Sequence, residues 1–93
     1  MRVGLFTPKE RNYKRNGMTT DSTFIEVTHV AEVLGALGGL GAKRVGLFYR
    51  DNKGAGHLEG DLFPAADFSR ENLDWIAGKS DSYQQRGLFY VKD

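Results

Sequence analysis

A short strand-like sequence occurs three times in this 93-residue chain, starting at Arg2, Arg44 and Arg86, which are equally spaced. The first copy reads Arg-Val-Gly-Leu-Phe, the second repeats it with an added Tyr, and the third reads Arg-Gly-Leu-Phe-Tyr. Apolar positions that alternate between Val/Leu and Gly/Phe are typical of a β-strand with two different faces. The repeat therefore predicts three related strands before any other feature is considered.

The segments between the copies contain further strand and helix signals. Thr23–Val27 is rich in β-branched and aromatic residues, and Asp51–Gly56 is typical of a hairpin loop that leads into a strand. Thr28 and Ser69 are candidate N-caps of two helices. The predicted elements, in chain order, are strands at 2–6, 23–27, 44–50, 57–63 and 85–91, helices after residues 28 and 69, and polar loops at 8–21 and 79–84.

Together these elements predict a single small α+β domain over residues 1–93, because a chain of this length has room for one core. We expect an antiparallel sheet of about five strands with two helices on one face. From Thr23 onward the order βαββαβ is that of ferredoxin-like domains, with Arg2–Phe6 as an extra N-terminal edge strand. The alternative is a pair of duplicated ββα units with a different strand order.

The composition favours a cytoplasmic protein. The chain has no cysteine, whereas small secreted domains usually depend on disulfides. It also lacks any apolar stretch near the ~20 residues that a membrane-spanning helix needs. We expect no interaction with a membrane.

The two faces of the repeated strands have different expected roles. The Val and Leu side chains are predicted to form the core beneath the helices. Phe6, Phe48 and Phe89 then lie on the opposite face, which also carries Arg2, Arg44 and Arg50. An open face of this kind can stack bases or bind a protein. The alternative is that the rings are themselves core residues or lie beneath a loop.

Charge is distributed unevenly along the chain. Residues 1–50 carry eight Lys or Arg against four Asp or Glu, whereas residues 51–93 carry five against eight. The densest basic segment contains Lys9, Arg11, Lys14 and Arg15, with Tyr13 among them. A long polar loop with this composition is a candidate contact for an acidic protein or for a nucleic-acid backbone.

Few residues are candidates for catalysis or for metal binding. His57, Glu59 and Asp61 alternate along one predicted strand, and their spacing is compatible with acid–base chemistry or with a metal site. Polar alternation is also the ordinary solvent-facing side of a strand. The chain contains no P-loop, dinucleotide-binding or nucleophile-elbow motif. We therefore predict no catalytic residues, no metal and no cofactor.

The function that these observations favour is a non-enzymatic binding protein that acts by protein–protein contact. Small cysteine-free domains of this character resemble accessory proteins of phages and mobile elements, some of which inhibit host defence or nucleic-acid-binding proteins. The alternative is a nucleic-acid-binding module that uses the basic loop and the Phe/Arg face. A homodimer through the edge strand Arg2–Phe6 is a further expectation. The predicted partner-binding residues are Lys9, Arg11, Tyr13, Lys14, Arg15, Phe48, Arg50 and Trp75, the last on the second helix.

Overall fold

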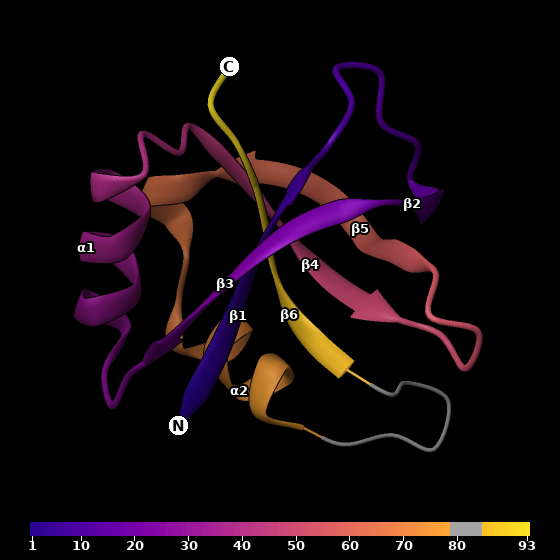
Figure 1. The fold of residues 1–93 in the computed structure, drawn as a ribbon. Coiled ribbons are helices and arrows are strands. Elements are labelled where there is room, and N and C mark those ends of the chain that lie inside the picture. The colour runs from indigo at the N-terminus through magenta and orange to yellow at the C-terminus, as the bar shows by residue number, and fades with distance from the viewer. Residues whose placement is uncertain (79–84) are drawn as a thin grey trace.

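The computed structural model describes residues 1–78 and 85–93, which form one α+β domain of two helices and a curled sheet (Figure 1). The predicted polar loop at 79–84 lies outside the described residues. The elements in chain order are β1 (Arg2–Pro8), β2 (Asn16–Met18), β3 (Thr20–Glu26), α1 (Val30–Gly39), β4 (Arg44–Arg50), β5 (Gly56–Pro64), a short 3-10 turn (Ala65–Asp67), α2 (Arg70–Ala77) and β6 (Gln85–Val91). None of the helices in this part of the chain is long and apolar enough to cross a membrane.

The six strands form one mixed sheet in the order β2-β5-β4-β6-β1-β3. The three copies of the repeated sequence become β4, β6 and β1, which are neighbours within the sheet. β4 pairs antiparallel with both β5 and β6, whereas β6 runs parallel to β1. The repeat thus predicted three strands, but it did not predict that they are neighbours or that the first copy lies inside the sheet.

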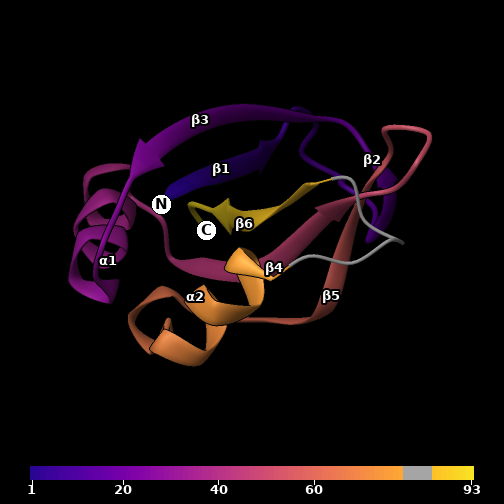
Figure 2. The ribbon, with the colours of Figure 1, turned by 90° about the horizontal axis from the view of Figure 1, so that it is seen from below.

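The sheet curls because its two outermost strands are consecutive in the chain. Only Thr19 separates β2, which pairs with β5, from β3, which pairs with β1. The segment from Asn16 to Glu26 therefore passes from one end of the strand order to the other. Figure 2 shows β3 arching over β1 on the side away from α2.

The convex face of the sheet and the two helices enclose a first core. It contains the Val and Leu side chains of the repeated strands, as the sequence predicted, and apolar residues of both helices. Its most buried members are Val3, Leu5, Val27, Val33, Leu37, Val45, Phe68, Leu73, Ile76, Leu88 and Tyr90. Both helices thus cover the same face of the sheet.

The concave face encloses a second core built from aromatic rings. Phe6 and Phe48 stack with their centroids 4.3 Å apart, and Phe89 lies 6.4 Å beyond Phe48. All three rings are fully buried, and Met18 and Leu58 are buried beside them. Each fully buried ring contributes about 1.5–3 kcal/mol to folding. The Gly/Phe face is therefore an interior surface: the prediction that the rings are core residues is confirmed, and the alternative of an open Phe/Arg face is wrong.

The ferredoxin-like arrangement was also wrong. It places the predicted strand Thr23–Val27 in the middle of the sheet, whereas β3, which contains most of it, is an outer strand. Arg2–Phe6, expected at an edge, lies in β1 between β6 and β3. The sheet is mixed because β6 runs parallel to β1, and it has six strands because the 8–21 segment contributes β2. The alternative of two ββα units agrees better, since β1 with β3 and β4 with β5 are antiparallel pairs that each precede a helix.

Local capping explains where the helices begin. Ser69 is the N-cap of α2, as predicted: its hydroxyl accepts from the Asn72 N–H at 3.4 Å, and its own N–H donates to Asn72 Oδ1 at 2.9 Å. The N-cap of α1 is His29, one residue after the predicted Thr28. The Glu32 carboxylate reaches back to accept from the hydroxyl and N–H of Thr28, and these hydrogen bonds lower the pKa of Glu32.

Candidate interaction surface

The loop of residues 9–15 lies over the second core and is attached to the sheet at several points. At its start, the Lys9 N–H donates to the Thr19 carbonyl at 3.2 Å. At its end, the Arg15 carbonyl accepts from the Leu58 N–H at 2.9 Å. Between them, the half-buried Tyr13 ring packs 5.1 Å from the ring of Phe89. The predicted loop is thus an ordered cover of the aromatic core.

Arg15 is one of these attachment points. Its guanidinium forms an ion pair with Asp61 at 2.8 Å and donates to the Gly60 carbonyl. Both side chains are exposed, so the pair contributes about 0–1 kcal/mol. Its larger effect is to neutralise the charge of Arg15 locally, so that the charges of the loop's other cations remain.

Lys9, Arg11 and Lys14 form what we call the basic loop surface. All three side chains are exposed, and none has an ion pair with any residue that the structure describes. A depression of about 350 Å³ lies between this loop and the end of β6. Its charged lining comprises Lys9, Glu10, Arg11, Lys92 and Asp93. Cations and carboxylates thus both line this accessible hollow, and Lys14 lies outside it, on the same fixed loop.

Arg50 and Phe48 are not part of the basic loop surface, and both take part in packing within the protein. Arg50 is half-buried, and its guanidinium carbon lies 5.3 Å from the Phe6 ring centroid and 5.7 Å from that of Phe48. The guanidinium donates to Gln85 Oε1, to the Gly54 carbonyl and to Thr20 Oγ1 at 3.1–3.3 Å. Arg50 thus connects three strands over the aromatic core, and Phe48 beneath it is not exposed to a partner.

Trp75 is not joined to the basic loop surface. It lies on α2, which packs on the first core, whereas the loop covers the second core on the opposite face of the sheet. The ring is half-buried, and the Arg86 guanidinium carbon lies 4.4 Å from its centroid. Arg86 also donates to the Trp75 carbonyl at 2.7 Å. The predicted partner-binding residues therefore do not form one surface.

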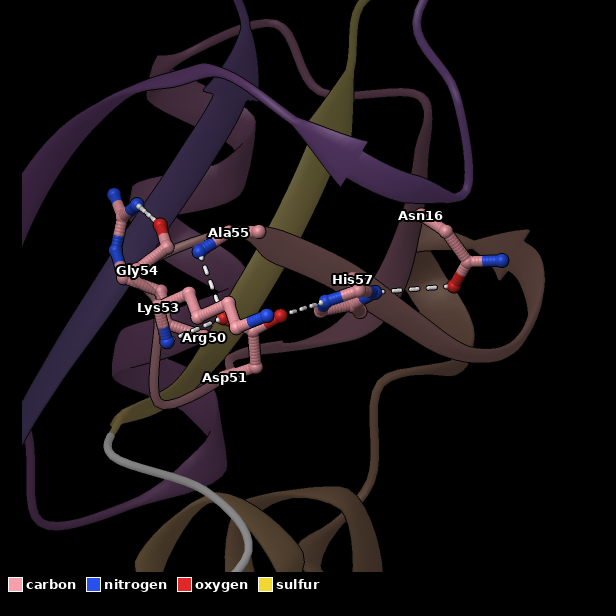
Figure 3. A network of polar contacts seen from close by, with 7 residues as sticks. All are labelled: Asn16, Arg50, Asp51, Lys53, Gly54, Ala55 and His57. Carbon is pink, nitrogen blue, oxygen red and sulfur yellow. Dashed lines mark hydrogen bonds and ion pairs between the residues drawn. The ribbon is translucent and has the colours of Figure 1, made fainter.

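A polar network at the β4–β5 hairpin was not predicted from the sequence (Figure 3). His57 lies between two oxygen-bearing side chains: Nε2 is 2.7 Å from Asp51 Oδ2, and Nδ1 is 3.1 Å from Asn16 Oδ1. Its ring also stacks on Tyr49 with a centroid distance of 5.1 Å. Asn16 is the cross-strand neighbour of His57, so the network fastens β2 to the hairpin.

Asp51 is held by its own loop as well as by His57. Its Oδ1 accepts from the backbone N–H groups of Lys53 and Ala55 at 2.8 and 3.0 Å. The hydrogen bond from His57, followed by that from Ala55, lowers the pKa of Asp51. An ionised Asp51 is therefore part of the folded hairpin. The signal in the sequence was the Asp51-Asn52-Lys53-Gly54 turn, but the pairing of His57 with Asn16 depends on the tertiary fold.

The alternating set His57, Glu59 and Asp61 is not gathered into one site. The β4–β5 register shifts near Gly60, which has a positive φ of 77°, and this irregularity interrupts the alternation. His57 binds Asp51, while Asp61 binds Arg15. Within residues 1–78 and 85–93, no group of three or more His, Cys, Asp or Glu side chains is arranged to hold a metal ion.

Comparisons with models of protein families, with curated proteins and with solved structures found no match to this chain.

Proposed function

We propose that this protein is a non-enzymatic binding module that recognises an acidic protein surface through Lys9, Arg11 and Lys14. The observation that carries the proposal is the combination of three exposed cations without ion pairs among the described residues and a loop fixed by Tyr13 and Arg15. A fixed loop loses little conformational entropy on binding, so its charges can contribute to affinity. Inhibition of a host defence or nucleic-acid-binding protein is one form of this proposal, suggested by size and character alone.

Nucleic-acid binding is the competing function, and the buried aromatic core weighs against it. Sequence-tolerant binding of single strands combines a basic groove with aromatic rings on which bases stack. Phe6, Phe48 and Phe89 are fully buried under the loop and β3 and so offer no stacking surface. The cations alone support contacts with a backbone, which would be weak and strongly dependent on salt.

The test compares two matched triple variants. Lys9→Gln/Arg11→Gln/Lys14→Gln removes the basic loop surface, and Lys43→Gln/Lys53→Gln/Arg70→Gln removes three exposed cations elsewhere. Wild type and both variants serve as bait in a bacterial lysate, and each is titrated into labelled poly-glutamate, single-stranded DNA and duplex DNA at low salt. We expect a stoichiometric protein that wild type and the control variant retain and that the loop variant loses. We also expect poly-glutamate to bind wild type and the control variant, and to lose binding to the loop variant.

Two results would contradict the proposal. Equal retention of the partner by all three proteins would show that another surface binds it. Loop-dependent binding of DNA with no binding of poly-glutamate would assign the same surface to nucleic acid.

A further inference from the structure

The two outer strands of the sheet differ in how they are protected from pairing with other chains. β2 is three residues long, and its pairing with β5 is irregular. β3 is seven residues long and pairs with β1 in an unbroken register from Thr20 to Glu26. Proteins usually protect an exposed edge by shortening it, by a bulge, or by Lys or Pro residues. β2 has two of these features, whereas β3 has none of them and carries two acidic residues, Asp21 and Glu26.

The hydrogen bonds at the ends of the β1–β3 ladder show which groups of β3 are unpaired. Met1 and Val27 exchange both backbone bonds, at 2.6 and 2.8 Å, and the Lys9 N–H donates to the Thr19 carbonyl. In an antiparallel pair, such bonded positions alternate with positions whose N–H and C=O point away from the partner. The outward-pointing residues within β3 therefore include Ser22, Phe24 and Glu26.

Phe24, the central member of this set, has an exposed ring. Among the described residues, the large apolar side chains left exposed are Met1 and Phe24, and Phe24 is 39% exposed. The ring is held in a defined position by an edge contact with Phe6 at 6.1 Å and by the Arg2 guanidinium carbon 4.3 Å from its centroid. An ordered, exposed aromatic residue at the middle of an unprotected edge is a suitable centre for a strand–strand interface.

We infer that β3 pairs antiparallel with β3 of a second copy of this chain, about a two-fold axis at Phe24. This register places Phe24 opposite Phe24 of the partner subunit and Ser22 opposite Glu26 of the partner subunit. Every outward-pointing group of these three residues then finds a backbone partner, and the two sheets become continuous across the axis.

The side chains are compatible with this self-pairing. The two Phe24 rings meet on one face, next to Arg2 of each copy. Ser22 can donate its hydroxyl to the Glu26 carboxylate opposite. On the other face, Asp21 lies opposite Val27, so no like charges are placed directly against each other. The homodimer expected from the sequence is thus assigned to β3 and not to Arg2–Phe6, which is already paired on both sides.

The dimer interface and the basic loop surface occupy different parts of the molecule. The loop lies beyond the end of β1 at the upper right of Figure 1, whereas β3 runs from there toward α1. A dimer about Phe24 leaves both loops accessible and presents two of them. The inference rests on the β3 edge alone and does not depend on the proposed function.

The experiment measures molar mass by size-exclusion chromatography with light scattering over a series of protein concentrations. The chain has a mass of 10.4 kDa, and we expect wild type to approach twice this value as concentration rises. Ser22→Pro removes one outward N–H without affecting a bond to β1, and Phe24→Lys places like charges on the axis. Both variants should weaken dimerisation at least ~10-fold, while Asn52→Lys, on the β4–β5 turn, should dimerise like wild type. Far-UV circular dichroism and thermal unfolding establish that each variant is folded.

Amide hydrogen exchange gives a second readout that a loss of folding would not imitate. In wild type, the amides of Ser22, Phe24 and Glu26 should exchange more slowly as concentration rises, whereas those of α1 should not change. A wild type that stays monomeric, or one that dimerises equally well with Ser22→Pro and Phe24→Lys, would overturn the inference. The inference would also be overturned if the protein stayed monomeric and its β3 amides became protected from exchange only on addition of an unrelated extended peptide.

Discussion

The ring of Phe6 occupies the space that a Cβ atom on Gly87 would fill. The two residues lie on the parallel strands β1 and β6, and a Cβ built on Gly87 would also approach the Gly4 carbonyl oxygen to 2.7 Å. The backbone of β1 cannot move without disturbing its other neighbour, β3. The glycine of the third repeat copy is therefore required by the packing of the first copy's phenylalanine.

Gly87→Ala is expected to destabilise the protein by about 1–3 kcal/mol, because the added methyl group overpacks the second core. Gly35→Ala is the matched control. Gly35 lies within α1 with no atom near the site of the new methyl group, so this change should stabilise by about 0.5–1 kcal/mol through helix propensity. Urea unfolding of both variants measures the difference. This explanation would be contradicted if both substitutions lowered, or both raised, the free energy of unfolding.

Phe48→Ala should cost about 3–5 kcal/mol, because it leaves a cavity between the stacked rings of the second core. Phe24→Ala removes the same number of atoms from an exposed site and should cost about 1 kcal/mol or less. Chemical denaturation at low protein concentration gives both values. Similar losses for the two variants would show that the concave face is not the interior of the protein.

Tyr13→Ala should release the loop of residues 9–15 from Phe89 and make it accessible to protease. Trypsin cleaves after Lys and Arg, and this loop contains Lys9, Arg11, Lys14 and Arg15. We expect cleavage in the loop at least ~10-fold faster than in wild type, because the open state of the loop becomes more populated. Tyr13→Phe retains the ring and should behave as wild type. Unchanged cleavage of Tyr13→Ala would mean that the loop's other contacts with the sheet are sufficient to hold it in place.

Asp51 predicts a specific dependence of stability on pH. The hydrogen bond from His57 lowers the pKa of Asp51 in the folded state below the ordinary value of 3.8. The contribution of ionised Asp51 to the free energy of unfolding is therefore complete when the pH lies above that ordinary value. It is lost as the pH falls through the lowered pKa of the folded state. We expect wild type to exceed Asp51→Asn in unfolding free energy at neutral pH, and the difference to shrink in acid.

The measurement is urea unfolding of both proteins at a series of pH values, with Asp67→Asn as the control. Asp67 is an exposed carboxylate of the 3-10 turn, so its replacement should leave the pH profile of wild type unchanged. A difference between wild type and Asp51→Asn that is constant across the acid range would mean that ionised Asp51 is not favoured in the folded hairpin.

Local sequence was sufficient for most of the elements. The strands at 44–50 and 85–91 have the predicted bounds, Ser69 caps α2 as predicted, and α2 ends at Ala77, next to Gly78. Strand β2 was missed, because Asn16–Met18 has no strand periodicity of its own and extends only through its pairing with β5. The basic loop was recognised from its composition, whereas its attachment through Tyr13 to Phe89 was not.

The sequence by itself determined five of the six strands, both helices and the two-faced pattern of the repeat, since these follow from side-chain alternation and capping over a few residues. Only the tertiary structure decided that the Phe face is an interior surface. A sheet becomes closed on one side when its outermost strands are consecutive in the chain, and that depends on pairings between distant segments. The same closure placed β1 inside the sheet and left β3, with Phe24 at its centre, as the long unprotected edge.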